Sequence, residues 1–276
     1  MSQVQPHLHP THVPEYLAEC LGTACMVFFG LSAVVFNFGH GLPMERWIPD
    51  HSTRLLITGL CFAGSGSLVA ISPLGRLSGA HINPSVSLAF WLLGKMRFID
   101  FAWYVVAQMV GGILGAGALV AVWKDYALTV NNGMTMPNHA WALWQVFAFE
   151  VALTGLLVLL IFIFVSTPRL MRWTPVMVWI VVAMMVWLEA PISGTSLNPA
   201  RSFGPALVSG VWDFQWLYMI APPLGGILGF LAFEIGLRAE REVLTGKLFH
   251  APNYRTIFKH APVTVQVSES NAEPMI

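Results

Sequence analysis

Long stretches of this chain contain no Asp, Glu, Lys or Arg, and they constrain the fold more than any other feature of the sequence. Several are longer than the roughly 18 apolar residues that identify a candidate membrane-spanning helix. The chain has 276 residues and is only 10% charged, whereas about a quarter of the residues in soluble domains carry charge. A soluble fold of this size cannot bury so much apolar surface. The sequence therefore predicts an all-α, multi-pass membrane protein.

Six apolar segments are long enough to cross a bilayer. We expect these spans at Glu15–Phe38, Arg54–Ser72, Phe101–Trp123, Ala140–Ser166, Trp173–Leu188 and Phe214–Leu237. Two further apolar runs, Pro84–Leu93 and Pro199–Ser209, reach only about 15 Å as helices, half of a hydrocarbon core that is ~30 Å thick. A half-length helix at membrane depth must be buried in protein or line a wet cavity, because lipid cannot satisfy its ends. The sequence therefore predicts two re-entrant half-helices.

The basic residues predict the orientation in the membrane. With the N-terminus in the cytoplasm, only Arg46, Arg54 and Lys124 lie outside, and the loops that hold most of the other Lys and Arg residues lie inside. We therefore expect both termini in the cytoplasm and the protein in the plasma or inner membrane. The membrane domain is predicted at 15–238. Residues 1–14 and 239–276 are expected to be cytoplasmic tails, the second of them basic near the membrane and disordered at its end.

Three short motifs occur twice, once in each half of the chain. They are SGAHINPSVSL and SGTSLNPARSF (from Ser78 and Ser193), GGILG (111–115 and 225–229), and AECLGT with its echo FEVALT (18–23 and 149–154). Each repeat, at about 15–123 and 140–238, holds a glutamate-bearing span, a second span, an Asn-Pro half-helix and a glycine-rich third span. Three spans per repeat is an odd number, so the second repeat enters the membrane from the opposite side. The N-termini of the two half-helices are therefore expected to meet near the middle of the bilayer.

Each half-helix begins with the pair Asn-Pro, at Asn83–Pro84 and at Asn198–Pro199. Asn is a favoured N-cap, and Pro fits the first helical position. Each helix N-terminus carries about half a positive charge, so two of them pointing into one space repel cations, protons included. The two Asn amides can donate hydrogen bonds to a passing molecule, and a water molecule held through its oxygen by two donors cannot also relay a proton. The pattern predicts a passage for neutral molecules that blocks charge.

SGAHINPS and SGTSLNPARSFGPAL resemble the signature loops of the aquaporin and glycerol-facilitator family, the major intrinsic proteins, and AECLGT and FEVALT are similar to its first and fourth helices. The resemblance extends over about residues 15–238 and is closer to the water-channel branch. It implies an aquaporin-like fold of six transmembrane helices and two re-entrant half-helices, in a homotetramer with one pore per subunit. Ala200 follows Asn-Pro as in most members, whereas Ser85 stands at that place in the first loop. Since Ser is nearly as small as Ala, we expect little change to the pore.

Arg201 is the lone cation in the second short apolar run, and an arginine at membrane depth indicates function. The resemblance places it at the outer constriction of the pore together with Thr195, Val186 and a second-span residue. We assign Phe62 to that last position, with Ala63 as the competing assignment, because the first loop is about one residue longer than usual. Val186 stands where water-selective members usually carry His. The filter is therefore expected to be wider and more apolar than a strict water filter.

Other positions favour water as the solute. Ser202 stands where glycerol facilitators typically carry Asp, and Ala206 and Tyr218 also fit the water-channel pattern, although Met219 does not. The sequence thus predicts a passive channel for water, with hydrogen peroxide and other small uncharged solutes as further candidates and with protons and ions excluded. The alternative is a glycerol-type facilitator for small polyols. Thr195 replaces the pore cysteine that water-conducting relatives often have, so resistance to mercurials is expected.

Glu19 and Glu150 lie inside spans that offer no chain of titratable partners, so they are expected to support the structure rather than to relay protons. In the family that the sequence resembles, these carboxylates accept hydrogen bonds from the re-entrant loops, and His81 is assigned to the same support. GGILG contains glycines at i and i+4, a pattern that lets membrane helices pack closely. We expect helix crossings at Gly111, Gly115, Gly225 and Gly229.

Other function classes find little support in the sequence. A net charge of zero argues against a nucleic-acid partner, and Cys20, Cys25 and Cys61 lack metal-ligand spacing. The histidines at 7, 9 and 12 are interpreted as incidental residues of a tail. A coupled transporter would need carboxylates near the midplane of the membrane, and the sequence places none there. An enzyme would need a catalytic cluster, and the sequence shows none at membrane depth. The partners expected are therefore the lipid bilayer and a small neutral solute, with no metal and no cofactor.

Overall fold

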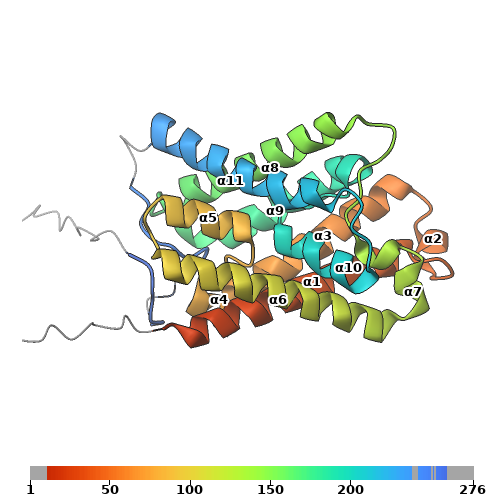
Figure 1. Cartoon of the computed structure of the whole chain (residues 1–276), viewed down its shortest axis with the longest axis horizontal. Helices are drawn as coiled ribbons and strands as arrows, with labels where there is room; N and C mark the ends of the chain where they lie inside the picture. The colour runs from red at the N-terminus through yellow and green to blue at the C-terminus, as the bar shows by residue number, and fades with distance from the viewer. Residues whose placement is uncertain (1–10, 238–241, 250, 252, 260–276) are drawn as a thin grey trace, which may run out of the picture.

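The computed structural model describes residues 11–237, 242–249, 251 and 253–259, and its regular elements are all helices. Within that part of the chain, six helices are long and apolar enough to cross a membrane. They are α1 (Val13–Phe38), α3 (His51–Ile71), α6 (Phe98–Trp123), α8 (Leu143–Val165), α9 (Thr174–Ser193) and α11 (Gln215–Gly236). They lie side by side in one bundle (Figure 1). The expected all-helical fold with six spans is confirmed.

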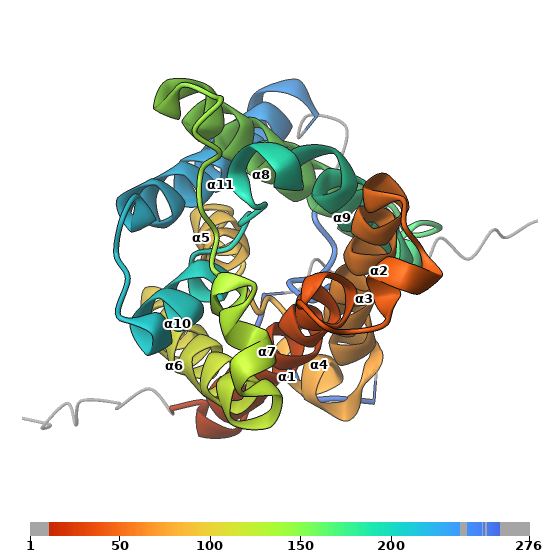
Figure 2. The same cartoon turned by 90° about the vertical axis from the view of Figure 1, so that its right-hand side faces the viewer.

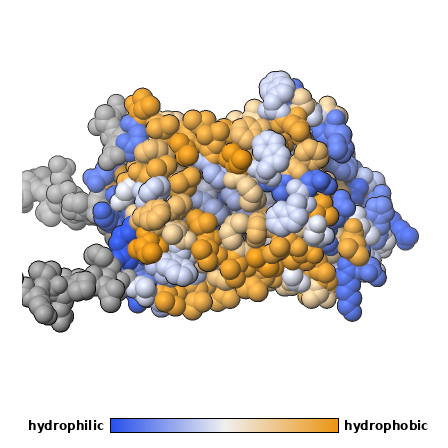
Figure 3. All heavy atoms as spheres, in the orientation of Figure 1, coloured by the Kyte–Doolittle hydropathy of each residue, from blue (hydrophilic) through white to orange (hydrophobic). Residues whose placement is uncertain are grey.

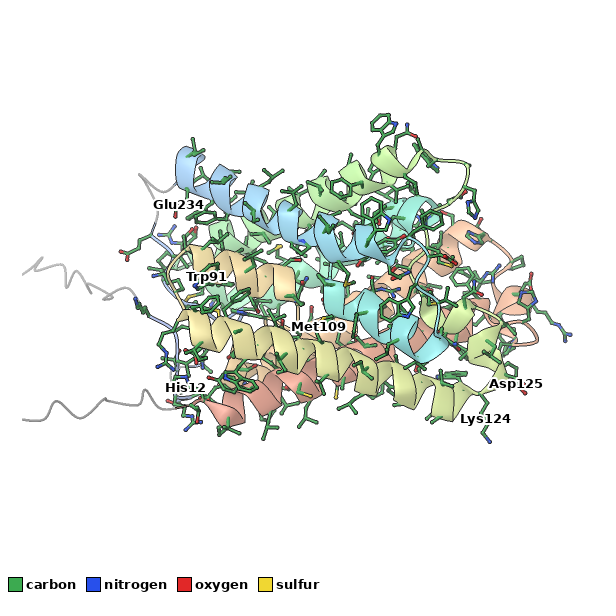
Figure 4. All side chains as sticks on the ribbon, viewed as in Figure 1. His12, Trp91, Met109, Lys124, Asp125 and Glu234 are labelled. Carbon is green, nitrogen blue, oxygen red and sulfur yellow. The ribbon has the colours of Figure 1, made fainter. Side chains whose placement is uncertain are left out.

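The surface of the bundle matches a protein that sits in lipid. Figure 3 shows an apolar belt around the middle of the visible face, with hydrophilic residues gathered at the two ends. The labelled side chains in Figure 4 follow the same division, because Lys124 and Asp125 lie at one end and Glu234 at the other, with Met109 between them. The end where α1 begins and α11 finishes is called the terminal end below. The other end is called the opposite end.

Two helices are too short to cross the bundle. These are α5 (Pro84–Leu92), with 9 residues, and α10 (Pro199–Ser209), with 11. Figure 1 shows α5 in the half of the bundle at the terminal end and α10 in the half at the opposite end. The two half-helices start near the middle and run outward in opposite directions, as inverted repeats require.

The fifth span differs most from its predicted bounds, whereas the ends of the other spans lie within three residues of theirs. The sequence suggested an end at Leu188, but α9 continues to Ser193. The reason is that Glu189 is buried rather than exposed at a helix end, and that Pro191 is accommodated in the last turn. Short helices that the sequence analysis did not identify form the connections. They are α2 (Met44–Trp47), α4 (Pro73–Ser78), α7 (Asp125–Leu128) and the 3₁₀ turns η1 (Asn131–Gly133) and η2 (Met171–Trp173).

The last span of each repeat packs against the half-helix of the other repeat. Helix α6 of the first repeat packs against α1 and against α10 of the second repeat, and α11 packs in the same way against α8 and α5. The middle glycine of each GGILG string makes the crossing with the half-helix. A Cβ added at Gly112 or at Gly226 would lie closer than 3.0 Å to the backbone carbonyl of Ala200 or Ser85, respectively. Only glycine lets these backbones approach so closely.

The four glycines predicted from the sequence lie at the crossings between full spans. A Cβ added at any of them would lie closer than 3.0 Å to a carbonyl oxygen of the neighbouring helix. The pairs are Gly111 with Cys20, Gly115 with Ala24, Gly225 with Val151, and Gly229 with Gly155. The middle glycines Gly112 and Gly226 stand in the same two strings, so the sequence already contained the glycines that make the crossings with the half-helices.

Candidate functional site

The two loops that lead into the half-helices have the same backbone conformation. Gly79 and Gly194 adopt φ values of 93° and 78°, where glycine is favoured. Further on, Ala80 and Ile82 in the first loop, and Thr195 and Leu197 in the second, also have positive φ, between 42° and 54°. Positive φ is uncommon in residues with a side chain and persists only where the surroundings hold it. Both loops are therefore positioned by their surroundings rather than by local preference.

One buried carboxylate holds each loop. Glu19 accepts hydrogen bonds from the backbone N–H groups of His81, at 3.0 Å, and Ile82, at 2.6 Å. Glu150 accepts from those of Ser196, at 2.7 Å, and Leu197, at 2.9 Å. Buried carboxylates would be costly without such partners, and here they satisfy backbone donors at membrane depth. The two predicted glutamates thus make equivalent contacts in the two repeats.

A serine and a tyrosine complete each of these supports, and the sequence analysis missed both. Ser78 donates to Glu19 at 2.7 Å and Ser193 to Glu150 at 2.6 Å. Tyr104 donates to the carbonyl of Ser78 at 2.7 Å, and Tyr218 to that of Ser193 at 2.6 Å. The serines are the first letters of the two repeated motifs, so the signal was present. Glu189 also reaches the hydroxyl of Ser193.

His81 supports the first loop from the side of the terminal end. Its ring stacks on Phe90 with the centroids 4.6 Å apart, and its Nε2 lies 2.9 Å from the carbonyl oxygen of Gly246. Because a carbonyl can only accept, Nε2 donates to it, and Nδ1 lies 3.1 Å from the hydroxyl oxygen of Ser87. Both ring nitrogens of the histidine are therefore engaged in this network.

The two Asn residues cap their half-helices and join the loops to each other. Asn83 Oδ1 accepts from the N–H of Ser85 at 2.9 Å, and Asn198 Oδ1 from that of Ala200 at 3.0 Å. Asn83 Nδ2 donates to the carbonyl of Leu197, and Asn198 Nδ2 donates to that of Ile82, both at 2.8 Å. Each amide thus donates to the residue before the other Asn. One N–H of each amide is used in this way, and the second is left for another acceptor.

Both Asn side chains line a central cavity of about 250 Å³. Figure 2 looks along the bundle from the opposite end, with the helices arranged around its axis. The cavity is lined mainly by apolar side chains, together with a few polar ones that include Thr58, His81 and Thr195. It therefore offers a largely apolar path with a small number of fixed hydrogen-bonding groups.

The residues predicted as the filter all lie on this cavity: Phe62, Val186, Thr195 and Arg201. Arg201 is buried, donates from Nη1 to the carbonyl of Gly133 at 2.7 Å, and places its guanidinium 5.4 Å from the centre of the Phe62 ring. Ala63, the competing assignment for the second-span position, lines the same cavity. Of Phe62 and Ala63, only Phe62 contacts Arg201.

Among the residues that the structure describes, no three His, Cys, Asp or Glu side chains come together in a way that could hold a metal ion. Cys20, Cys25 and Cys61 are free thiols. Of the N-terminal histidines, His7 and His9 lie outside the described residues, and His12 contacts Asp100 at 2.8 Å. The last residues of the C-terminal tail, 260–276, also lie outside the described part.

Comparison with known proteins gives a consistent result. A family model described as "Major intrinsic protein" matches residues 8–233. Nodulin-26 of Glycine max is 29% identical over 225 residues, which is 79% of this chain and 76% of that protein. Aquaporin-8 of Notomys alexis is 30% identical over 233 residues, which is 83% of this chain and 84% of that protein.

A solved structure has the same fold. The X-ray structure of the aquaglyceroporin from Plasmodium falciparum aligns with a TM-score of 0.69 at 22% sequence identity. The alignment covers 82% of this chain and 97% of that one. At this level of identity the likeness concerns the fold.

Proposed function

Because this chain belongs to the major intrinsic protein family, whose members are membrane channels for water or small neutral solutes and not enzymes, we propose that it is a passive water channel that excludes protons and other ions. The single observation that carries the proposal is the reciprocal pair of hydrogen bonds between the Asn83 and Asn198 loops. These bonds bring the N-termini of two half-helices to one cavity.

Charge exclusion follows from this arrangement. Each half-helix directs the positive end of its dipole and an Asn amide towards the same space. A cation entering that space loses its hydration and meets two positive dipole ends, whereas a water molecule can accept hydrogen bonds through its oxygen. Arg201 adds a full positive charge along the same cavity. These groups favour neutral solutes over cations.

The filter supports water as the solute, with hydrogen peroxide as a further candidate. Arg201 and Thr195 supply hydrogen-bonding groups, while Phe62 and Val186 supply apolar walls. Ser202 is buried, and its hydroxyl is engaged by those of Thr135 at 2.7 Å and Ser196 at 2.6 Å. A serine in that position holds the loop through hydrogen bonds and adds no charge to the path.

Two further proposals concern the assembly and the orientation. By the family resemblance, we propose that the protein forms a homotetramer. From the distribution of the basic residues, we propose that both termini lie in the cytoplasm.

Stopped-flow light scattering on proteoliposomes tests the solute. Water permeability should exceed that of protein-free liposomes, and glycerol entry should stay near the protein-free rate. Val186→Phe, which places a larger side chain in the wall of the cavity, should reduce water permeability several-fold. The matched control Ile180→Phe on the same helix, at a side chain that is 56% exposed on the outside of the bundle, should leave it unchanged. Faster entry of glycerol than of water would overturn the proposal in favour of a glycerol-type facilitator.

A further inference from the structure

A segment near the C-terminus closes onto the bundle at its terminal end. We call the described residues 242–249, 251 and 253–259 the C-terminal clamp; they are drawn in blue at the left of Figure 1. Three of its backbone N–H groups donate to the bundle: Leu244 to Val165 at 3.1 Å, Leu248 to Gly79 at 3.0 Å, and Lys259 to Lys95 at 2.9 Å. These acceptors lie at the end of α8 and on both sides of α5. The clamp therefore spans from the second repeat to the first.

Charged groups fix the clamp in place. The side chain of Lys247 is buried, and its Nζ donates to the carbonyls of Arg76, at 2.6 Å, and Arg255, at 2.8 Å. Arg255 in turn pairs with the buried carboxylate of Glu15 in α1 at 2.7 Å. Burying an ammonium group is unfavourable unless it is hydrogen-bonded, so this residue specifies one docked position.

The clamp is joined directly to the first Asn-Pro loop. His81, which lies two residues before Asn83, donates to the carbonyl of Gly246, and its ring centre lies 5.2 Å from that of Phe258. A Cβ added at Gly246 would collide with the ring of Phe258, so a glycine is needed for this close approach. The support of the Asn83 loop therefore includes residues from the far end of the chain.

The side chain of Leu248 reaches the solute path itself. Leu248 is 5% exposed and lines the same cavity as Asn83, Asn198 and Arg201. Phe249, the next residue, is not part of that lining and lies against Arg76, whose guanidinium is 5.5 Å from its ring centre. Adjacent residues of the clamp thus have different surroundings, one inside the path and one outside it.

We propose that Leu248 is a pore-lining residue that narrows the path at the terminal end, and that the clamp holds it there. This inference rests on the channel function proposed above. An apolar side chain offers water no hydrogen bond, so its effect is steric: a larger side chain narrows the mouth and a reactive one allows it to be blocked. The path then has two selective regions, one at Arg201 and one supplied by the C-terminal clamp.

Thiol labelling tests the proposal. Leu248→Cys and the matched control Phe249→Cys are reconstituted separately, and water permeability is measured before and after addition of a mercurial. Wild-type protein treated in parallel accounts for Cys20, Cys25 and Cys61. We expect a several-fold loss of permeability in the Leu248→Cys protein and little change in the other two. Equal responses of the two variants, with labelling of both thiols verified by mass spectrometry, would overturn the inference.

A second measurement uses side-chain size. Leu248→Trp should lower the unit water permeability, and Leu248→Ala should leave it equal or raise it. If Leu248→Trp yields no folded protein, the cysteine pair decides alone. If the wild-type protein conducts water and the Leu248 variants have the same water permeability, the proposed role of the clamp is wrong and the channel function is unaffected. A wild-type protein without water permeability would reject the channel function.

Discussion

Replacing Glu150 by Gln should destabilise the fold without changing which solutes pass. The carboxylate accepts from the backbone N–H groups of Ser196 and Leu197, one on each oxygen, and it shares the single hydroxyl hydrogen of Ser193 with Glu189. A glutamine keeps one carbonyl oxygen but presents an NH₂ group in place of the second. If the carbonyl stays with Ser193 and Ser196, the N–H of Leu197 faces another donor.

The size of the effect follows from these contacts. A buried N–H left without an acceptor costs about 1–3 kcal/mol, and each of the two remaining hydrogen bonds weakens by about 1 kcal/mol because its acceptor is no longer charged. The expected loss is therefore roughly 3–5 kcal/mol. By the scaling for folded domains, this corresponds to a fall in melting temperature on the order of 10 °C. Glu19→Gln should behave similarly, since Glu19 holds His81 and Ile82 in the same way.

The assay is fluorescence-detected size-exclusion chromatography of heated, detergent-solubilised protein, followed by water and glycerol permeability of whatever folds. Glu45→Gln, at an exposed position on α2, is the matched control and should match wild type. We expect lower yield and a lower melting temperature for Glu150→Gln with an unchanged ratio of water to glycerol permeability. Normal yield and melting temperature combined with an altered ratio would refute the supporting role of this glutamate.

Three further predictions concern other parts of the molecule. Burial, opposed in part by the charge of Glu15, lowers the pKa of Lys247 to about 8, so the docked clamp binds fewer protons than a free one above that pH. Docking of the clamp should therefore tighten as pH rises from about 8 towards 10.5, and proteinase K should cleave the clamp more slowly relative to an unfolded substrate. Lys247→Met should abolish this pH dependence. A relative cleavage rate of the wild-type clamp that is the same at both pH values would contradict the prediction. Mercury should not block wild-type water flux, whereas Thr195→Cys should make it sensitive; strong block of wild type would mean that the filter is misplaced. Gly112→Ala should reduce folded yield sharply because its Cβ would meet the carbonyl of Ala200. Gly117→Ala on the same helix is the control and should leave the yield unchanged, because a Cβ there meets nothing within 4 Å. Equal yields of the two variants would refute the packing argument.

The six spans and two half-helices could be predicted because membrane burial leaves a strong signal in composition. A charge-free stretch of sufficient length has few alternatives to a spanning helix, and an Asn-Pro pair before a short apolar run marks where a half-helix begins. The end of α9 was missed because Glu189 has the sequence appearance of an exposed helix end. Its burial depends on packing that the sequence does not display.

The second-span filter position illustrates a different limit. Phe62 and Ala63 are adjacent in the sequence, and the length of the following loop did not decide between them. Both line the cavity, but the contact with Arg201 belongs to Phe62. Such a contact depends on the rotation of α3 about its axis, which is set by packing against neighbouring helices.

The C-terminal clamp could not be anticipated for a simpler reason. Its residues show no helical or strand periodicity, and many of its hydrogen bonds go to backbone carbonyls, such as those of Gly79 and Arg76. Every residue offers a carbonyl, so such contacts leave no mark on the sequence of the partner. The burial of Lys247 together with the apolar Val243, Leu248 and Phe258 distinguishes this segment only once the structure is known.

The measurement that tests the account most directly combines water flux and ion flux in one preparation. Proteoliposomes containing the wild-type protein are divided, and one part is used for osmotic water permeability and the other for proton flux under an imposed membrane potential. If two opposed half-helix N-termini share one lumen, water permeability will rise with the amount of protein, and proton flux will stay at the level of protein-free liposomes. An ion flux that rises in proportion to water permeability would contradict the central claim.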